Sequence, residues 1–458
     1  MSSIETIWYS VIGLCCLFAL ADWRKAIFVG ILIDVLRDPV RKLTPEQPVA
    51  ITLSVAVVWL VIVLVAALSN AGQVRALFRN YPKLRTALQL GVMALIPAAG
   101  ISILSYNRGW LMAAIGAASY MVPAIGILAG FVAFRREVDL RRLFIYYITV
   151  NSLMLISVPL EYSGLDWPAF GGIDYDWIRY YENTTVNLMC GWYRSPDIMG
   201  LHAAQVIMFC LLLSMRSRNE SAFAWPLLAV WAAFCVFVSG RRKMIGIPLV
   251  FVAVFLALGL TIRLTRLNRL TGAVAVLAIL AAAASVLIWS PDEASGHVDL
   301  AMTLVTQGVT RSNEILSGSV LGTLQQSGII GAGLGSATQG RYYAGIKTNS
   351  RAGWQEDGVS RLLLEFGVPG LLLLIIAIFL VLRCLKKAVI SIPRQSELAL
   401  MQVGLVSIVA GNAASFAISH QQFSGDPVSA LVVTLMVGAI FKMPGLVVDQ
   451  KPAIGGTA

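Results

Sequence analysis

Long apolar segments alternate with short polar segments along this chain. A window of about 19 residues identifies twelve segments that are apolar enough to cross a bilayer. Most of them have the length of about 17–22 residues that a helix needs to cross the hydrocarbon core. The pattern therefore predicts an all-α polytopic integral membrane protein with about 12 transmembrane helices, forming one domain over residues 1–458. The predicted spans are residues 7–21, 49–68, 87–105, 111–133, 143–160, 196–215, 222–239, 244–262, 271–289, 362–382, 397–417 and 427–442.

The composition also indicates a lipid environment. Hydrophobic residues make up 58% of the 458 residues and charged residues only 13%, whereas about 25% of a soluble protein is charged. Because so few charges cannot cover a water-exposed surface, a cytosolic enzyme, a disulfide-stapled secreted domain and a disordered scaffold are excluded. The six cysteines form neither a disulfide framework nor a metal-binding spacing, so we expect no metal and no cofactor.

The basic residues predict the orientation. A formal net charge of +11 is compatible with nucleic-acid binding, but lysine and arginine occur in short clusters between the spans rather than on one basic face, so we expect no nucleic acid as partner. Every second connector between spans is basic, so the basic connectors all lie on one side of the membrane, which is predicted to be the cytoplasmic side. They are residues 75–85, 135–142, 216–218, 263–269 and 383–394. The remaining connectors are then outside, and they are residues 107–109, 161–195, 239–243, 291–361 and 419–427.

Residues 22–48 do not fit this alternation. Residues 26–36 are apolar but too short for an ordinary span, and basic residues flank them on both sides. The segment fits a short crossing, a re-entrant piece or an interfacial helix equally well. The side on which the N-terminus lies is therefore left open.

Residues 239–243 contradict the positive-inside pattern. Arg241, Arg242 and Lys243 are adjacent cations in a short turn on the predicted outer side. Cations at membrane depth cost about 2.5–3.5 kcal/mol each, so the cluster needs a compensating anion. A phosphate group is the natural candidate, because guanidinium groups match its oxygens and a helix starting at Met244 would add its positive dipole end. The alternative is a miscounted span, which would make the cluster a cytoplasmic anchor.

The long outer segment, residues 291–361, contains a second group of polar residues and is a plausible lid over a substrate. Gly331, Gly333 and Gly335 resemble a phosphate loop only superficially, because no strand precedes them and no Lys-Ser or Lys-Thr follows. A tight turn or close helix packing explains them better. Glu356 and Asp357 precede the next span, where acids also favour a helix N-terminus, and for Asp357 we prefer this role as a cap.

The first outer segment mixes aromatic and acidic residues and ends in Trp192, Tyr193 and Arg194. Aromatic rings stack on sugar rings and carboxylates accept sugar hydroxyls, but tryptophan and tyrosine also collect at any bilayer interface. The pattern alone favours neither explanation. We expect His202, inside its span, to be a structural polar residue.

In this order, the motifs resemble the O-antigen ligase and O-antigen polymerase superfamily, whose members transfer lipid-pyrophosphate-linked glycans on the outer face of the bacterial inner membrane. The similarity covers about residues 190–385. Arg194-Ser195-Pro196-Asp197 corresponds to a Pro-Asp turn entering a span, and Ser239-Gly240-Arg241-Arg242 to a small-residue-Arg turn. Arg311 corresponds to an arginine in the long outer loop. Gly331-Ala332-Gly333-Leu334-Gly335 corresponds to a Gly-x-Gly-x-Gly element, and Glu365-Phe366-Gly367-Val368-Pro369-Gly370 to a Glu-x-Gly-x-x-Gly element.

One departure concerns the catalytic base. The ligases carry a His-Asn pair about nine residues before that glutamate, whereas this chain has Glu356-Asp357. No ligase-type histidine can therefore be assigned, and the segment is more similar to repeat-unit polymerases of exopolysaccharide systems. The resemblance implies a metal-independent, inverting glycosyltransferase of the bacterial inner membrane, with its active site facing outward and undecaprenyl-pyrophosphate-linked oligosaccharide as donor.

The resemblance also implies roles for individual residues. Arg241, Arg242 and Arg311 would hold the pyrophosphate, and Glu356 would accept the proton of the acceptor hydroxyl, with Asp357 as the reserve base. The residues expected to contact the glycan are Arg194, Trp192, Tyr193 and Arg361.

The expected partners are the lipid-linked glycan, the bilayer, and chain-length regulators or export proteins of a polysaccharide pathway. Three other functions remain open. They are an O-antigen ligase that transfers glycan to another acceptor, a flippase or transporter of the same lipid-linked glycan, and a noncatalytic assembly subunit.

Overall fold

The computed structural model consists of two compact units, each assembled from two separate stretches of the chain. Unit 1 comprises residues 1–62 and 140–311, and unit 2 comprises residues 63–139 and 312–458. The predicted domain, residues 1–458, thus contains two packing units. The structure describes residues 2–173, 177–181, 184–216, 224–262, 297, 310, 313, 317–338, 340–341, 344–346, 355, 357–393, 396–419 and 427–449.

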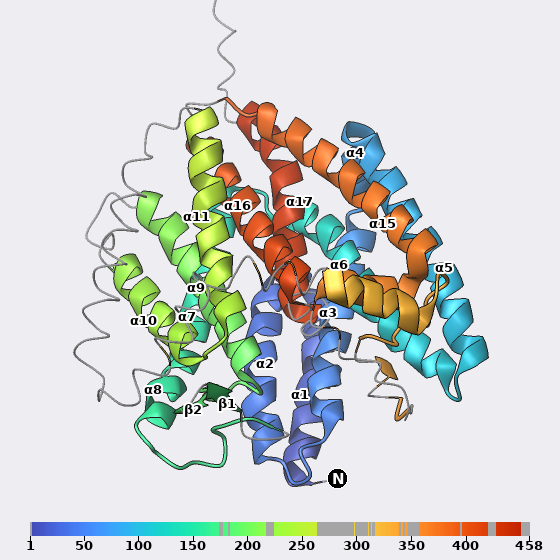
Figure 1. The fold of residues 1–458 in the computed structure, drawn as a ribbon. Coiled ribbons are helices and arrows are strands. Elements are labelled where there is room, and N and C mark those ends of the chain that lie inside the picture. The colour runs from blue at the N-terminus through green and yellow to red at the C-terminus, as the bar shows by residue number, and fades with distance from the viewer. Residues whose placement is uncertain are drawn as a thin grey trace, which may run out of the picture. The chain divides into compact units, whose positions relative to one another are not determined.

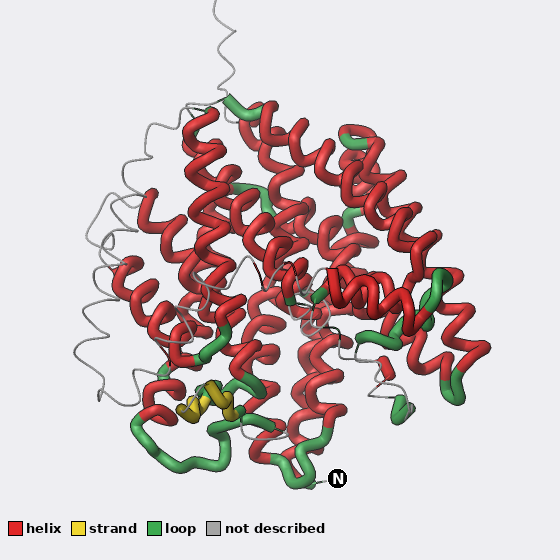
Figure 2. The backbone as a smooth tube through the Cα atoms, in the orientation of Figure 1, coloured by secondary structure: helices red, strands yellow, loops and turns green. Residues whose placement is uncertain are grey.

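Helices make up most of the described chain, and the two short strands form one hairpin, drawn in yellow in Figure 2. In unit 1 the elements are α1 (Ser3–Ala21), α2 (Trp23–Leu43), most of α7 (Glu137–Leu155), α8 (Ser157–Tyr162), β1 (Ile178–Tyr181), β2 (Thr184–Asn187), α9 (Pro196–Arg216), α10 (Ala224–Val238) and α11 (Arg242–Thr261). In unit 2 they are α4 (Ala71–Asn80), α5 (Pro82–Ser105), α6 (Gly109–Ala133), α15 (Gly358–Ile390), α16 (Glu397–Ile418) and α17 (Pro427–Asp449), and α3 (Val49–Ser69) belongs to both units.

Ten helices in the described part of the chain are long and apolar enough to cross a bilayer. All ten coincide with predicted spans, so the prediction of an all-α, multi-pass membrane protein is confirmed. The predicted span at residues 222–239 is a shorter apolar helix, α10. The predicted span at residues 271–289 lies outside the described residues. Most of residues 22–48, left open by the sequence, form the continuous helix α2 (Trp23–Leu43), which is not among the ten.

Unit 1 is built around α9, in which almost every residue is buried. The helix packs against α10 and α11 and also contacts α7, where the rings of Phe144 and Phe209 stack with their centroids 4.5 Å apart. The hairpin of β1 and β2 precedes α9, with Ile178 opposite Asn187. Trp192, Tyr193 and Arg194, predicted to contact a glycan, lie immediately before α9. The packing of α9 therefore fixes the C-terminal end of the segment that contains them.

Unit 2 is built around two helix pairs, α6 with α17 and α5 with α15, which run side by side in Figure 1. Glycines allow the backbones of the first pair to approach closely. A Cβ atom at Gly130 would lie 2.1 Å from the carbonyl oxygen of Leu435, and one at Gly438 would lie 2.2 Å from that of Ile127. Small residues are the usual means of close helix packing within a bilayer, so neither position accommodates a larger side chain.

Candidate functional site

The cationic segment of unit 1 differs in shape from the predicted turn. Helix α10 ends at Val238 and α11 begins at Arg242, so only Ser239, Gly240 and Arg241 connect them. The prediction of a helix starting at Met244 was therefore wrong, and Arg242 and Lys243 belong to the first turn of α11. Two cations at the N-terminus of a helix are unfavourable, because this is the positive end of the helix dipole. An anion at this position would compensate both.

One such anion is Asp197, in the first turn of α9. Its Oδ2 atom lies 3.1 Å from Nη2 of Arg241, and its Oδ1 atom lies 2.9 Å from Nζ of Lys243. The Asp197 side chain is only 4% exposed, while those of Arg241 and Lys243 are 16% and 23% exposed. Because one carboxylate is shared between two cations, the three groups keep a net positive charge that a phosphate could balance.

The close approach of α9 to the start of α11 depends on a glycine. A Cβ atom at Gly200 would lie 2.9 Å from Cγ of Met244 and 3.3 Å from Oγ of Ser239. Ser239 in turn accepts a hydrogen bond from the backbone amide of Arg241 at 3.2 Å. The small residues of both motifs therefore bring Asp197 and Arg241 together.

An aromatic ring completes the cluster. The guanidinium carbon of Arg241 lies 4.6 Å from the ring centroid of Trp177, which directly precedes strand β1. Stacking against an indole face holds a guanidinium group in place without using its N–H donors. Arg241 is thus positioned by a carboxylate on one helix and a ring beside the hairpin.

Three of the four residues predicted to contact a glycan, Trp192, Tyr193 and Arg194, lie in one segment, which is held by side chains of unit 1. Glu161 accepts the backbone N–H groups of Cys190 and Gly191, and the hydroxyl of Ser157 accepts that of Trp192. The Trp192 ring is half-buried. It packs edge-on against Trp167, with centroids 5.8 Å apart, so an indole pair is present where a sugar-stacking surface was expected.

Tyr193 does not have the exposure expected of a glycan contact. Its side chain is 1% exposed, its hydroxyl donates to Oδ1 of Asn151 at 3.0 Å, and its ring stacks on that of His202 with centroids 5.3 Å apart. Burial raises the pKa of the Tyr193 hydroxyl, so the group stays neutral. Buried and hydrogen-bonded in this way, the side chain of Tyr193 is not exposed to contact a glycan. His202, 2.7 Å from the hydroxyl of Tyr147, is buried and structural, as expected.

Helix α2 anchors the same segment from the other side. Asp38 forms two contacts with Arg194: its Oδ2 accepts the backbone N–H at 3.1 Å, and its Oδ1 lies 3.3 Å from Nη1. The Lys42 ammonium donates to the carbonyl oxygens of Ala169, Gly191 and Tyr193 at 3.2, 2.8 and 2.7 Å. Burial lowers the pKa of Lys42, and the three carbonyls compensate for its lost hydration.

Unit 2 contains the two glycine motifs, packed against one another. Gly331, Gly333 and Gly335 all have positive φ, at 89°, 93° and 86°, in the left-handed region that favours glycine. A Cβ at Gly331 would lie 2.5 Å from the backbone nitrogen of Gly367, and one at Gly335 would lie 2.3 Å from the carbonyl oxygen of Met112. The prediction of a tight turn or close packing is confirmed.

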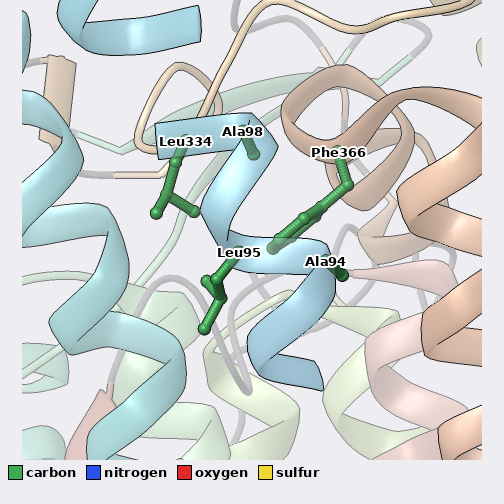
Figure 3. Close-up of a cluster of buried hydrophobic side chains, with 5 residues drawn as sticks. All are labelled: Ala94, Leu95, Ala98, Leu334 and Phe366. Carbon is green, nitrogen blue, oxygen red and sulfur yellow. The ribbon is translucent and has the colours of Figure 1, made fainter. Parts of the chain in front are cut away.

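The loop that contains Gly331, Gly333 and Gly335 is attached to the core by one leucine and to α15 by one carboxylate. Figure 3 shows Leu334 of the loop and Phe366 of α15 beside the α5 residues Ala94, Leu95 and Ala98, all of them buried. Glu365 is fully buried, and its Oε1 accepts the backbone N–H groups of Ala337 and Thr338 at 3.0 and 2.7 Å. Glu365 therefore organises the loop that follows the glycines.

Two predicted site residues lie at the start of α15. Asp357 is fully buried and caps the helix, accepting the backbone N–H of Ser360 at 2.7 Å, so its expected role as a cap is confirmed. Arg361 donates to the carbonyl oxygen of Gln355 at 3.0 Å and to that of Ala337. In this structure Arg361 braces the loop, and Asp357 is not exposed as a reserve base would be.

Glu356 and Arg311, the predicted base and the third predicted pyrophosphate ligand, lie outside the described residues. Arg241 and Arg242 lie together at the start of α11, in unit 1. Two residues were not recognised as site residues from the sequence, Asp197 and Glu365. Both belong to the motifs that carry the family resemblance, and the signal that could have identified them is an acidic side chain within or just before an apolar span.

Searches against family models and against curated proteins found no match to this chain.

Proposed function

We propose that this chain is a glycosyltransferase that polymerises undecaprenyl-pyrophosphate-linked oligosaccharide repeat units into an exopolysaccharide or O-antigen at the outer face of a bacterial inner membrane. The observation that carries the proposal is the convergence of two motifs that are distant in the sequence. Asp197 of the Pro-Asp turn holds Arg241 and Lys243 of the small-residue-Arg turn, at 3.1 and 2.9 Å. The carboxylate shared by these two cations leaves them with a net positive charge.

The proposed chemistry uses the excess charge of this cluster. The hydroxyl oxygen of the acceptor sugar attacks the anomeric carbon of the donor, and the bond from that carbon to the phosphate oxygen breaks. Undecaprenyl pyrophosphate leaves with the bonding electron pair. Arg241 and Arg242 stabilise the negative charge that develops on the leaving oxygen, which is where fixed cations accelerate a reaction most. Arg311 would add a third guanidinium group.

The proton of the acceptor hydroxyl passes to the carboxylate of Glu356 in this proposal. Attack from the face opposite the pyrophosphate inverts the anomeric carbon. Trp192, packed edge-on against Trp167, offers the ring face for the glycan, and Arg194, paired with Asp38, lies close to it in the chain. Asp197 is then a positioning residue that keeps Arg241 in place.

The test is transfer by the purified full chain in detergent, with a defined lipid-linked repeat unit as the only substrate. Dimers and higher multiples on a gel are expected from the unmodified protein. Arg241→Ala should lower their rate of formation at least ~100-fold, as expected for the loss of a group that stabilises the leaving charge, and Glu356→Gln should lower it similarly. Lys25→Ala is the matched control, because Lys25 is an exposed cation of unit 1 that pairs with its helix cap Asp22 at 3.0 Å.

The outcomes separate the candidate functions. Full-length polymer from Arg241→Ala and Glu356→Gln, at normal protein levels, would end this mechanism. Transfer to a different acceptor without self-polymerisation would indicate a ligase. Absence of transfer, together with movement of the lipid-linked glycan across a vesicle bilayer, would indicate a flippase. Unchanged polymer in cells carrying Glu356→Gln would indicate an assembly subunit.

A further inference from the structure

Unit 2 has a cavity of about 190 Å³ where several of its helices end. Its walls come from α4, from the junction between α4 and α5, from the end of α6 and from the last turns of α17. Helix α15 also ends here, because Lys387, in its last turn, donates to the carbonyl oxygen of Asn80 at 2.9 Å. The lining residues are Gln73, Ala76, Asn80, Tyr81, Phe131, Phe441, Lys442, Pro444 and Gly445.

The cations around this cavity lie against aromatic rings. Nζ of Lys442 lies 5.2 Å from the ring centroid of Phe131, and Nζ of Lys387 lies 5.5 Å from that of Tyr81. Among the residues that the structure describes, neither ammonium group forms a salt bridge. Each is therefore available to an anion that comes from outside the protein.

The sequence places no carboxylate in the stretches of chain that form the cavity walls. Residues 47–136, 366–396 and 427–448 contain no aspartate or glutamate, and these three stretches include every wall of the cavity. Arg75 and Arg79 of α4 add two exposed cations on the same short helix. A basic pocket between helix ends, without acidic residues, attracts the phosphate of a lipid headgroup.

The chemistry of the walls matches an amphiphile. Phe131, Phe441 and Pro444 provide apolar surface, while Gln73 and Asn80 provide side-chain amides at the α4 wall. Tyr81 donates its hydroxyl to the carbonyl oxygen of Phe441 at 3.4 Å. Burial raises the pKa of Tyr81 to about 12, so the hydroxyl adds no negative charge that would repel a phosphate.

The helix dipoles oppose an anion here, because α4, α6 and α17 all have their negative, C-terminal ends near the cavity. Lys387 counters this effect by donating to the exposed carbonyl of Asn80. We propose that the cavity binds an anionic phospholipid, with Lys442 and Lys387 on the phosphate of its headgroup and the aromatic walls on its glycerol and first acyl carbons. This site is separate from the cationic cluster of unit 1 and does not depend on the proposed transferase activity.

The test is native mass spectrometry of the full chain, released from detergent after titration with phosphatidylglycerol or phosphatidylcholine. We expect the unmodified protein to retain phosphatidylglycerol at concentrations at least tenfold lower than phosphatidylcholine. Lys442→Ala should weaken phosphatidylglycerol retention about tenfold, while Lys442→Arg and the control Lys25→Ala should leave it within twofold. Inorganic phosphate at millimolar concentration should not displace the lipid.

A second variant keeps the proposal testable if Lys442→Ala fails to fold. Ala76→Trp fills the cavity without changing the charge and should also abolish the preference for phosphatidylglycerol. Equal retention of both lipids by the unmodified protein, or unchanged retention by Lys442→Ala or Ala76→Trp, would overturn the proposal. Displacement of the lipid by inorganic phosphate would assign the cavity to a soluble phosphate compound and would overturn the lipid assignment.

Discussion

The Nη2 atom of Arg241 lies 3.1 Å from Oδ2 of Asp197, and this contact joins the connector between α10 and α11 to the first turn of α9. The two residues are far apart in the sequence. Their contact allows a cationic segment to exist next to the apolar core of unit 1, because Asp197 compensates part of its charge. The pair thus links the stability of unit 1 to the geometry of the proposed pyrophosphate site.

Asp197→Asn tests this link. Removing one partner of a buried pair costs about 3–5 kcal/mol, and the partial exposure of Arg241 and Lys243 lowers our expectation to about 1–3 kcal/mol of unfolding free energy. We expect a melting temperature several degrees lower in detergent and a transfer rate at least tenfold lower. Asp22→Asn, which removes an exposed pair with Lys25, should change neither. An unchanged melting temperature for Asp197→Asn would show that the contact contributes nothing.

Glu365 provides a second prediction, for the loop of unit 2. Glu365→Ala leaves the amides of Ala337 and Thr338 without their acceptor, and each buried unsatisfied amide costs about 1–3 kcal/mol. Hydrogen exchange at these two amides should become at least tenfold faster. Glu365→Gln keeps a side-chain oxygen at the position of Oε1 and should preserve most of the protection. Equal protection in the alanine variant would mean that the carboxylate does not hold the loop.

Gly333 gives a third prediction, with a control in the same region. At Gly333, φ is 93° and a Cβ would lie 2.5 Å from Oγ of Ser102, whereas at Gly328, φ is 65° and a Cβ would have no other atom within 4 Å. Left-handed backbone costs a non-glycine residue about 1–2 kcal/mol, and overpacking adds about 1–3 kcal/mol. Gly333→Ala should therefore lower the melting temperature clearly more than Gly328→Ala does. Equal effects would exclude a steric role for Gly333.

Lys42 gives a fourth prediction. Lys42→Met keeps most of the side-chain volume but leaves the carbonyls of Ala169, Gly191 and Tyr193 without a donor. We expect a loss of at least about 2 kcal/mol of unfolding free energy, since unsatisfied buried groups cost about 1–3 kcal/mol each. Limited proteolysis should then cut the 161–195 segment faster. Lys25→Met, on the same helix but exposed, should behave like the unmodified protein.

The membrane spans were predictable because burial in lipid imposes a local rule on about twenty consecutive residues. The start of helix α11 at the cationic segment was not predictable in this way. Arg242 and Lys243 are poor residues for a helix N-terminus by local criteria, and what compensates the charge here is Asp197 on another helix. A rule that considers only sequence neighbours therefore placed the start of α11 at Met244, two residues too late.

Tertiary contacts also explain why the burial of Tyr193 and the form of residues 22–48 were not predictable from the sequence. An aromatic residue beside Trp192 is typical of a sugar-binding site. In the structure, however, Asn151 of α7 and His202 of α9 contact the side chain of Tyr193. The apolar run within residues 22–48 was too short for an ordinary span, and the carbonyls that accept from Lys42 of α2 belong to residues more than a hundred positions later. The tight glycine loop was anticipated correctly because alternating glycines are typical of a backbone that needs left-handed φ angles or close contacts.

The ammonium of Lys42, surrounded by three backbone carbonyls, occupies a position like that of a coordinated potassium ion. Because this cation is covalently attached, it is present in fixed stoichiometry and cannot be removed by dialysis or exchanged for sodium. The carbonyls of Ala169, Gly191 and Tyr193 therefore keep their donor whatever the monovalent salt composition of the surrounding medium.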